Sequence, residues 1–73
     1  MIDTLEFYHE LLNHKIDFFA GVPDSLLADL CACIKTNSPE EKNVITANEG
    51  NAVAMAAGYH ISTGKIGCVY MQN

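Results

Sequence analysis

A single glutamate, Glu49, has the setting that points most directly to chemistry. It stands between a strand-like apolar run that ends at Ala47 and an alanine-rich segment that begins near Gly50. The carboxyl group therefore lies at a strand-to-helix junction, and open α/β sheets bind their ligands at the carboxyl ends of the strands. Because an ionisable group among apolar residues costs free energy unless it is paired or functional, we interpret Glu49 as a carboxylate that handles a proton or anchors a cofactor. The structural alternative is that Glu49 complements the dipole at the start of the helix.

A second group of candidates follows the first predicted strand, in the turn over residues 21–25. Gly21 and Pro23 interrupt regular structure there, and the turn is expected at the same edge of the sheet as Glu49. Asp24 and Ser25 are candidates for contacts with a substrate or its protons. They can equally act as caps of the following helix, with Pro23 fixing the turn, and the residues alone leave both interpretations open.

The cysteines and histidines give weaker signals. Cys31 and Cys33 are two positions apart on a predicted helix, so they point to different faces. We therefore interpret them, together with Cys68, as small half-buried hydrophobic residues rather than as a metal or redox group. The histidines are expected to be exposed or structural: His9, His14 and His60. No metal ligand is predicted in this chain.

The hydrophobic pattern predicts helices that alternate with strands. The expected helices cover about 4–14, 26–35 and 51–62, and the expected strands cover 16–20, 44–47 and 67–71. This order implies right-handed parallel crossovers, and hence an α/β fold with helices on both faces of a parallel sheet. The third helix is apolar on nearly every side and should pack against more than one element. No closing helix follows the third strand, so we expect an incomplete three-layer domain that needs partners.

The composition limits the classes of protein and partner. The chain has 73 residues, of which 49% are hydrophobic, which is typical of a globular protein, although a chain of this length buries only about 60% of its unfolded surface. A net charge of −5, with four lysines and no arginine, argues against nucleic acid or an anionic membrane as a partner. The apolar runs are shorter than a membrane span and the start lacks a signal-peptide pattern, so a cytoplasmic protein is expected.

Three motifs follow one another in a specific order and spacing: Gly21-Val22-Pro23, then Glu49, then Ala56-Ala57-Gly58-Tyr59 with Thr63-Gly64-Lys65. Together they resemble the pyrimidine-binding domain of thiamine-diphosphate-dependent enzymes. The resemblance covers essentially the whole chain. It is closer to the phosphonopyruvate decarboxylases, and the related sulfopyruvate decarboxylases look similar, through residues 21–27, 47–54 and 69–73.

This resemblance implies the cofactors thiamine diphosphate and Mg²⁺. It implies that Glu49 has the role of the family's glutamate, which hydrogen-bonds the ring nitrogen N1′ of the aminopyrimidine. Gln72 and Asn73, at the end of the third strand, are expected to line the cofactor pocket. Residues 1–73 do not match the family's diphosphate- and Mg²⁺-binding domain. They are therefore expected to form the N-terminal part of the pyrimidine-binding domain, completed in a homo-oligomer or by a diphosphate-binding domain or subunit.

The implied reaction is the decarboxylation of a small anionic 2-oxo acid, 3-phosphonopyruvate, to phosphonoacetaldehyde and CO₂. These residues alone are expected to be inactive. The alternative within the same chemistry is the pyrimidine-binding subunit of a sulfopyruvate decarboxylase. The alternative of another class is a non-catalytic interaction module that keeps the fold. A general nucleotide-binding fragment is disfavoured because no Gly-x-Gly-x-x-Gly or phosphate-loop pattern occurs.

Overall fold

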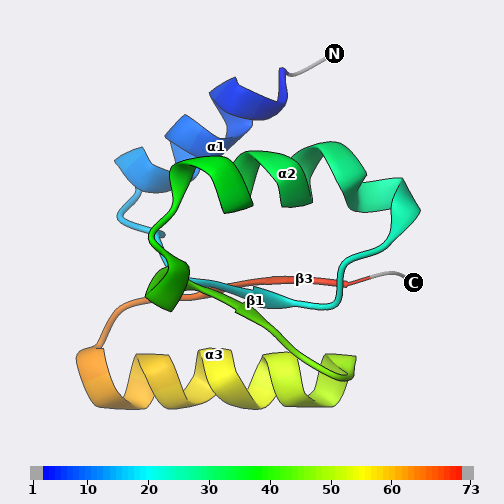
Figure 1. Ribbon diagram of the computed structural model, residues 1–73. Helices are drawn as coiled ribbons and strands as arrows, with labels where there is room; N and C mark the ends of the chain where they lie inside the picture. The colour runs from blue at the N-terminus through cyan, green and yellow to red at the C-terminus, as the bar shows by residue number, and fades with distance from the viewer. Residues whose placement is uncertain (1–2, 72–73) are drawn as a thin grey trace.

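The computed structural model describes residues 3–71, apart from the side chain of Leu26, and in this part of the chain a parallel sheet lies between two layers of helices (Figure 1). The elements are α1 (Thr4–Asn13), β1 (Phe19–Gly21), the 3-10 turn η1 (Ser25–Leu27), α2 (Ala28–Asn37), the 3-10 turn η2 (Glu40–Lys42), β2 (Asn43–Ile45), α3 (Glu49–Thr63) and β3 (Cys68–Tyr70). The strand order is β2-β1-β3, with both pairs parallel. Helices α1 and α2 cover one face and α3 covers the other. The predicted α/β class and order of elements are confirmed.

Local hydrogen bonds explain where α3 begins and ends. The helix starts at Glu49, earlier than predicted, because Asn48 is the N-cap and its Oδ1 accepts the backbone N–H of Asn51 at 2.9 Å. It ends at Thr63 because Gly64 takes a left-handed φ of 76°, which a residue with a side chain adopts at a cost. The helix thus ends one residue later than predicted.

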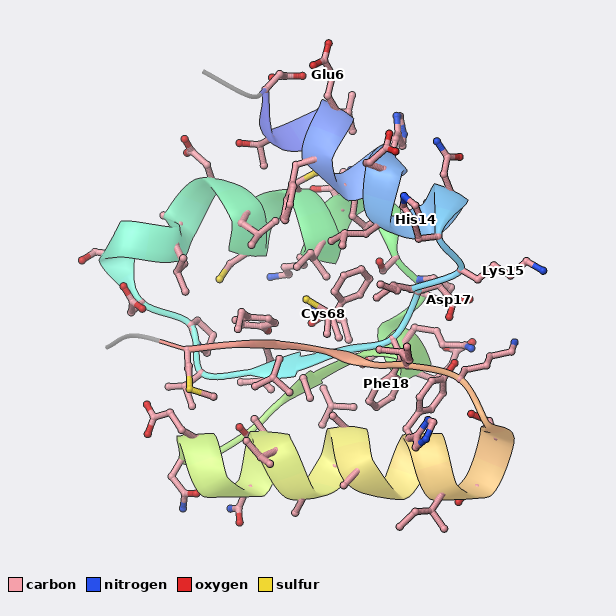
Figure 2. All side chains as sticks on the ribbon, turned by 180° about the vertical axis from the view of Figure 1, so that it is seen from behind. Glu6, His14, Lys15, Asp17, Phe18 and Cys68 are labelled. Atoms are coloured by element: carbon pink, nitrogen blue, oxygen red, sulfur yellow. The ribbon has the colours of Figure 1, made fainter. Side chains whose placement is uncertain are left out.

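The sheet divides the core into two clusters of buried side chains. Tyr8, Phe19, Ile34 and Tyr70 form the cluster beneath α1 and α2, and Phe18, Ala20 and Ala52 form the cluster facing α3. Figure 2 shows Phe18 on the α3 side of the sheet and Cys68 on the opposite side. The Phe18 ring stacks on Tyr59 with centroids 4.2 Å apart, which joins the start of β1 to the last turns of α3.

Two surfaces that were expected to be covered are open in the described chain. Strand β2 lies at one edge of the sheet, and Ile45 at its end is 58% exposed. Helix α3 packs on β1 and β3 through its inner face, while Val53 and Ile61 are 52% and 83% exposed. The predicted helices on both faces of the sheet therefore do not cover Ile45. The apolar outer surface of α3 has no neighbour among residues 3–71.

Burial predicts a loss of stability at alkaline pH. Desolvation raises the pKa of the Cys68 thiol above 9.0, and desolvation, followed by the nearby Cys31 and Cys68 thiols, raises the pKa of Tyr70 above 10.0. The unfolded chain then releases these protons at a lower pH than the folded chain does. Because the folded state holds more protons in that range, the free energy of unfolding is expected to fall as the pH rises above about 9.

Denaturant titrations between pH 7 and 11 test this expectation. In the Cys68→Ala variant, the free energy of unfolding should begin to fall only near pH 10, where Tyr70 begins to contribute. If the free energy of unfolding of the variant and of the wild type depended on pH in the same way, Cys68 would not cause the first part of the decrease.

Candidate functional site

The carboxyl ends of the strands meet at one edge of the sheet, where backbone hydrogen bonds continue past the strands. The N–H of Thr46 donates to the carbonyl of Gly21 at 2.9 Å, and the N–H of Val22 donates to the carbonyl of Tyr70 at 3.3 Å. The start of α3 and the end of β3 lie at this same end of the molecule (Figure 1). The structure thus brings the turn after β1 and the turn before Glu49 together at one edge, as predicted.

Glu49 is the first residue of α3 and its side chain is exposed. The expectation of buried surroundings is wrong for residues 47–51, which are all exposed. The physical reason is that this turn follows an edge strand, and no element of the described chain covers it. The carboxyl group is consequently accessible to a ligand or a partner. Its location in the first turn also suits complementation of the helix dipole, so the role of Glu49 in proton transfer stays a prediction.

The residues just before Glu49 are held by side-chain hydrogen bonds. The Thr46 hydroxyl lies 3.0 Å from the carbonyl of Asn48 and 3.3 Å from the carbonyl of Gly21. Asn48 itself is the N-cap of α3. Sequence reasoning did not single out Thr46, although Ser and Thr side chains commonly hydrogen-bond backbone groups two residues further along the chain.

Gly21 is required by the packing of a neighbouring strand. A Cβ atom there would lie 2.5 Å from a ring carbon of Tyr70 and 2.3 Å from the Tyr70 carbonyl oxygen. The buried Tyr70 ring therefore lies against the backbone of β1, and its hydroxyl donates to Oδ1 of Asn43 on β2 at 3.2 Å. Through this side chain, β3 is tied to both of the other strands. No local pattern along the chain indicates this contact.

The other predicted site residues have mixed outcomes. Asp24 is half-buried, and its backbone carbonyl accepts the N–H of Leu27 at 3.2 Å. Ser25 is exposed and opens η1. A 3-10 turn precedes α2 and Leu27 occupies its N-cap position, so the alternative in which Asp24 or Ser25 is the N-cap of α2 does not hold. Gln72 and Asn73 lie outside the described residues.

Most lysines of the chain lie at the amino ends of the strands. Lys15, Lys42 and Lys65 each precede a strand, and Lys35 lies in the last turn of α2. Figure 2 shows Lys15 and Asp17 at the end of the sheet opposite the start of α3. At that end Lys42 Nζ lies 3.8 Å from Asp17 and 5.5 Å from the centre of the Tyr59 ring. Lys35 instead lines a pocket with Pro23, Ile45 and Tyr70, so one lysine borders the carboxyl edge.

Residues 6–73 match the family model described as "Thiamine pyrophosphate enzyme, N-terminal TPP binding domain". The chain belongs to this family, whose cofactor is also called thiamine diphosphate. Comparisons with curated proteins and with solved structures gave no match. Between residues 3 and 71, no helix combines the length and apolar character needed to cross a membrane. The predicted resemblance to thiamine-diphosphate-dependent enzymes is thereby confirmed at the level of the family.

The residues at the carboxyl edge fit one part of this cofactor. An accessible carboxyl group suits the ring nitrogen of an aminopyrimidine, which can share a proton with it. A diphosphate with its metal needs cations and clustered ligands, and three of the four lysines precede the strands at their amino ends. Residues 3–71 also contain no group of three or more His, Cys, Asp or Glu side chains that could hold a metal ion. Among the described residues, the carboxyl edge thus offers a partner for the pyrimidine and no cluster of ligands for a metal-bound diphosphate.

Proposed function

We propose that this chain is the pyrimidine-binding part of a thiamine-diphosphate-dependent 2-oxo acid decarboxylase, in which Glu49 holds the proton at N1′ of the cofactor. The observation that carries the proposal is the position of Glu49. It opens α3 at the carboxyl edge of a parallel sheet, in a chain whose residues 6–73 match the family. Thiamine diphosphate, when bound, supplies the carbanion chemistry of 2-oxo acid decarboxylation.

The start of α3 fixes the backbone from which the Glu49 side chain extends. Asn48 fixes the first turn through its bond to Asn51 and so orients the backbone that carries Glu49. Covering the edge would exclude water and strengthen a hydrogen bond between the carboxyl group and a ring nitrogen. Glu49 would then give and take the proton at one carboxyl oxygen.

The exposure of Glu49 implies that a second protein surface completes the site. From Gly50 to Gly64 the chain carries no charged residue other than the titratable His60, and Val53 and Met55 are 52% and 43% exposed on α3. A diphosphate-binding domain or subunit that covers this helix would bury apolar surface and could bring further cations to the carboxyl edge. We therefore include a homo-oligomer or a diphosphate-binding partner in the proposal.

We propose 3-phosphonopyruvate as the substrate and Mg²⁺ as the metal held by the partner. The support is the resemblance through residues 21–27 and 47–54, which include the Asp24 turn and the Glu49 turn. Asp24 and Ser25 are the proposed substrate contacts, since their turn follows β1 at the same edge as Glu49. A dianionic phosphonate needs cations, so most of its binding charge is expected from the completing partner.

Release of CO₂ by the assembled protein tests the proposal. The assay compares 3-phosphonopyruvate with sulfopyruvate, with and without thiamine diphosphate and Mg²⁺. We expect cofactor-dependent release with a preference for 3-phosphonopyruvate. A preference for sulfopyruvate would overturn the substrate and leave the role of Glu49 standing. No release with thiamine diphosphate present would overturn the decarboxylase and favour a non-catalytic interaction module.

A further inference from the structure

We propose that Thr46 is a positioning residue for Glu49, through a side-chain hydroxyl that ties the start of α3 to the end of β1. The inference rests on the proposed function of Glu49, because a positioning role has meaning only if the carboxyl group must be held in place. Thr46 touches neither cofactor nor substrate in this proposal. It acts by restricting the turn that leads into α3.

The contacts of Thr46 join two segments that are far apart in the sequence. Its backbone N–H donates to the Gly21 carbonyl at 2.9 Å and extends the pairing of β1 with β2 by one bond. Its hydroxyl lies 3.0 Å from the Asn48 carbonyl and 3.3 Å from the Gly21 carbonyl. The hydroxyl has one hydrogen to donate, and these two acceptors share it. The peptide that enters Glu49 is thereby held against the strand that leads into the Pro23 turn.

The hydroxyl is not needed to satisfy either carbonyl group. The Gly21 carbonyl accepts the N–H of Thr46 at 2.9 Å, and the Asn48 carbonyl accepts the N–H of Ala52 at 3.2 Å. Removing the hydroxyl therefore leaves no carbonyl without a partner, and the global stability should change little. The backbone bond between Thr46 and Gly21 remains, and what is lost is the additional side-chain link from the turn to β1. This distinguishes positioning from a general contribution to folding.

The chain offers a matched control at the other end of the same helix. The Thr63 hydroxyl donates to the Tyr59 carbonyl at 2.7 Å and accepts the N–H of Lys65 at 3.0 Å. Thr63→Val removes a hydroxyl from the same residue type at the last residue of α3, at the end away from Glu49. Any effect that comes only from weakening α3 should appear in this variant as well.

The test uses Thr46→Val, Thr46→Ser and Thr63→Val in the assembled protein. Valine keeps the branched shape without the hydroxyl, and serine keeps the hydroxyl. In Thr46→Val we expect faster amide hydrogen exchange at Asn51 and Ala52, measured without thiamine diphosphate. We also expect a decarboxylation rate at saturating cofactor that is about three- to tenfold lower, as the loss of one hydrogen bond implies. The Thr46→Ser and Thr63→Val variants should both keep the wild-type amide exchange and the wild-type decarboxylation rate.

The possible results separate this inference from the proposed function. Suppose that Glu49→Gln inactivates the enzyme while Thr46→Val keeps the wild-type amide exchange and the wild-type rate. This result would overturn the role of Thr46 and leave the role of Glu49 in place. Equal losses in Thr46→Val and Thr63→Val would also overturn it, because the effect would then be one of helix stability. An unchanged rate in Glu49→Gln would overturn the proposed function, and the positioning role of Thr46 with it.

Discussion

Replacing Glu49 by Gln is expected to lower the rate of thiamine-diphosphate-dependent decarboxylation by about 10²–10⁴-fold, the usual contribution of a positioned acid–base group. Glutamine has nearly the same size and can still form a hydrogen bond, but its amide cannot hold a titratable proton. Because Glu49 is exposed, the substitution removes no packing from the core. The rate should therefore fall without loss of the folded protein. Steady-state CO₂ release, with the thermal unfolding midpoint of the same samples, measures both.

Glu6→Gln is the matched control for the helix-dipole alternative. Glu6 is an exposed acid in the first turn of α1, as Glu49 is in the first turn of α3. If Glu49 only complements a helix dipole, both variants should lose about 0.3–1 kcal/mol of stability and neither should lose its rate. We expect Glu6→Gln to keep the wild-type rate. Equal rates in the two variants would contradict a catalytic role for Glu49.

The second large effect is expected from Gly21→Ala. The new Cβ atom would lie 2.3 Å from the Tyr70 carbonyl oxygen and 2.5 Å from the Tyr70 ring. Gly21 and Tyr70 are paired residues of β1 and β3, so relief of this clash must open the pairing of the strands or move a buried ring. Overpacking of this kind costs about 1–3 kcal/mol, and a backbone atom cannot move aside as a flexible side chain can. The denaturant midpoint of the assembled protein should fall accordingly.

Gly58→Ala is the control for this substitution. Gly58 lies inside α3, it is exposed, and no atom lies within 4 Å of a Cβ built there. Alanine is the better helix former, so this variant should gain about 0.5–1 kcal/mol. Opposite shifts in the two denaturant midpoints are therefore predicted. A Gly21→Ala protein as stable as the wild type would show that Tyr70 does not pack against β1 as described.

Local signals predicted the features of this fold that depend on neighbouring residues. The predicted helix over 51–62 matches α3 to within about two residues, because helix ends depend on caps such as Asn48 and Gly64 within one helical turn. The alternation of helices and strands followed from the hydrophobic pattern, and parallel pairing followed from the helices between the strands. The same reasoning placed Glu49 at the carboxyl edge of the sheet.

The remaining features depend on contacts across the sheet that no local pattern specifies. The order of the strands makes β2 an edge, and this exposes Ile45 and the turn that carries Glu49. The contact of Tyr70 with Gly21 and Asn43 joins three strands from separate parts of the sequence. Thr46 was missed for a related reason, since one of its acceptors is the carbonyl of Gly21 on another strand. Site residues that act through such contacts need the folded structure to be found.

The structure of the assembled protein with thiamine diphosphate bound tests the central claim most directly. The measured quantity is the distance between the Glu49 carboxyl oxygens and N1′ of the cofactor. We predict that one oxygen lies within hydrogen-bonding distance of N1′, with a partner surface covering α3 and excluding water. A Glu49 carboxyl group that faces solvent, with N1′ hydrogen-bonded to a different carboxylate, would contradict the proposed role of Glu49.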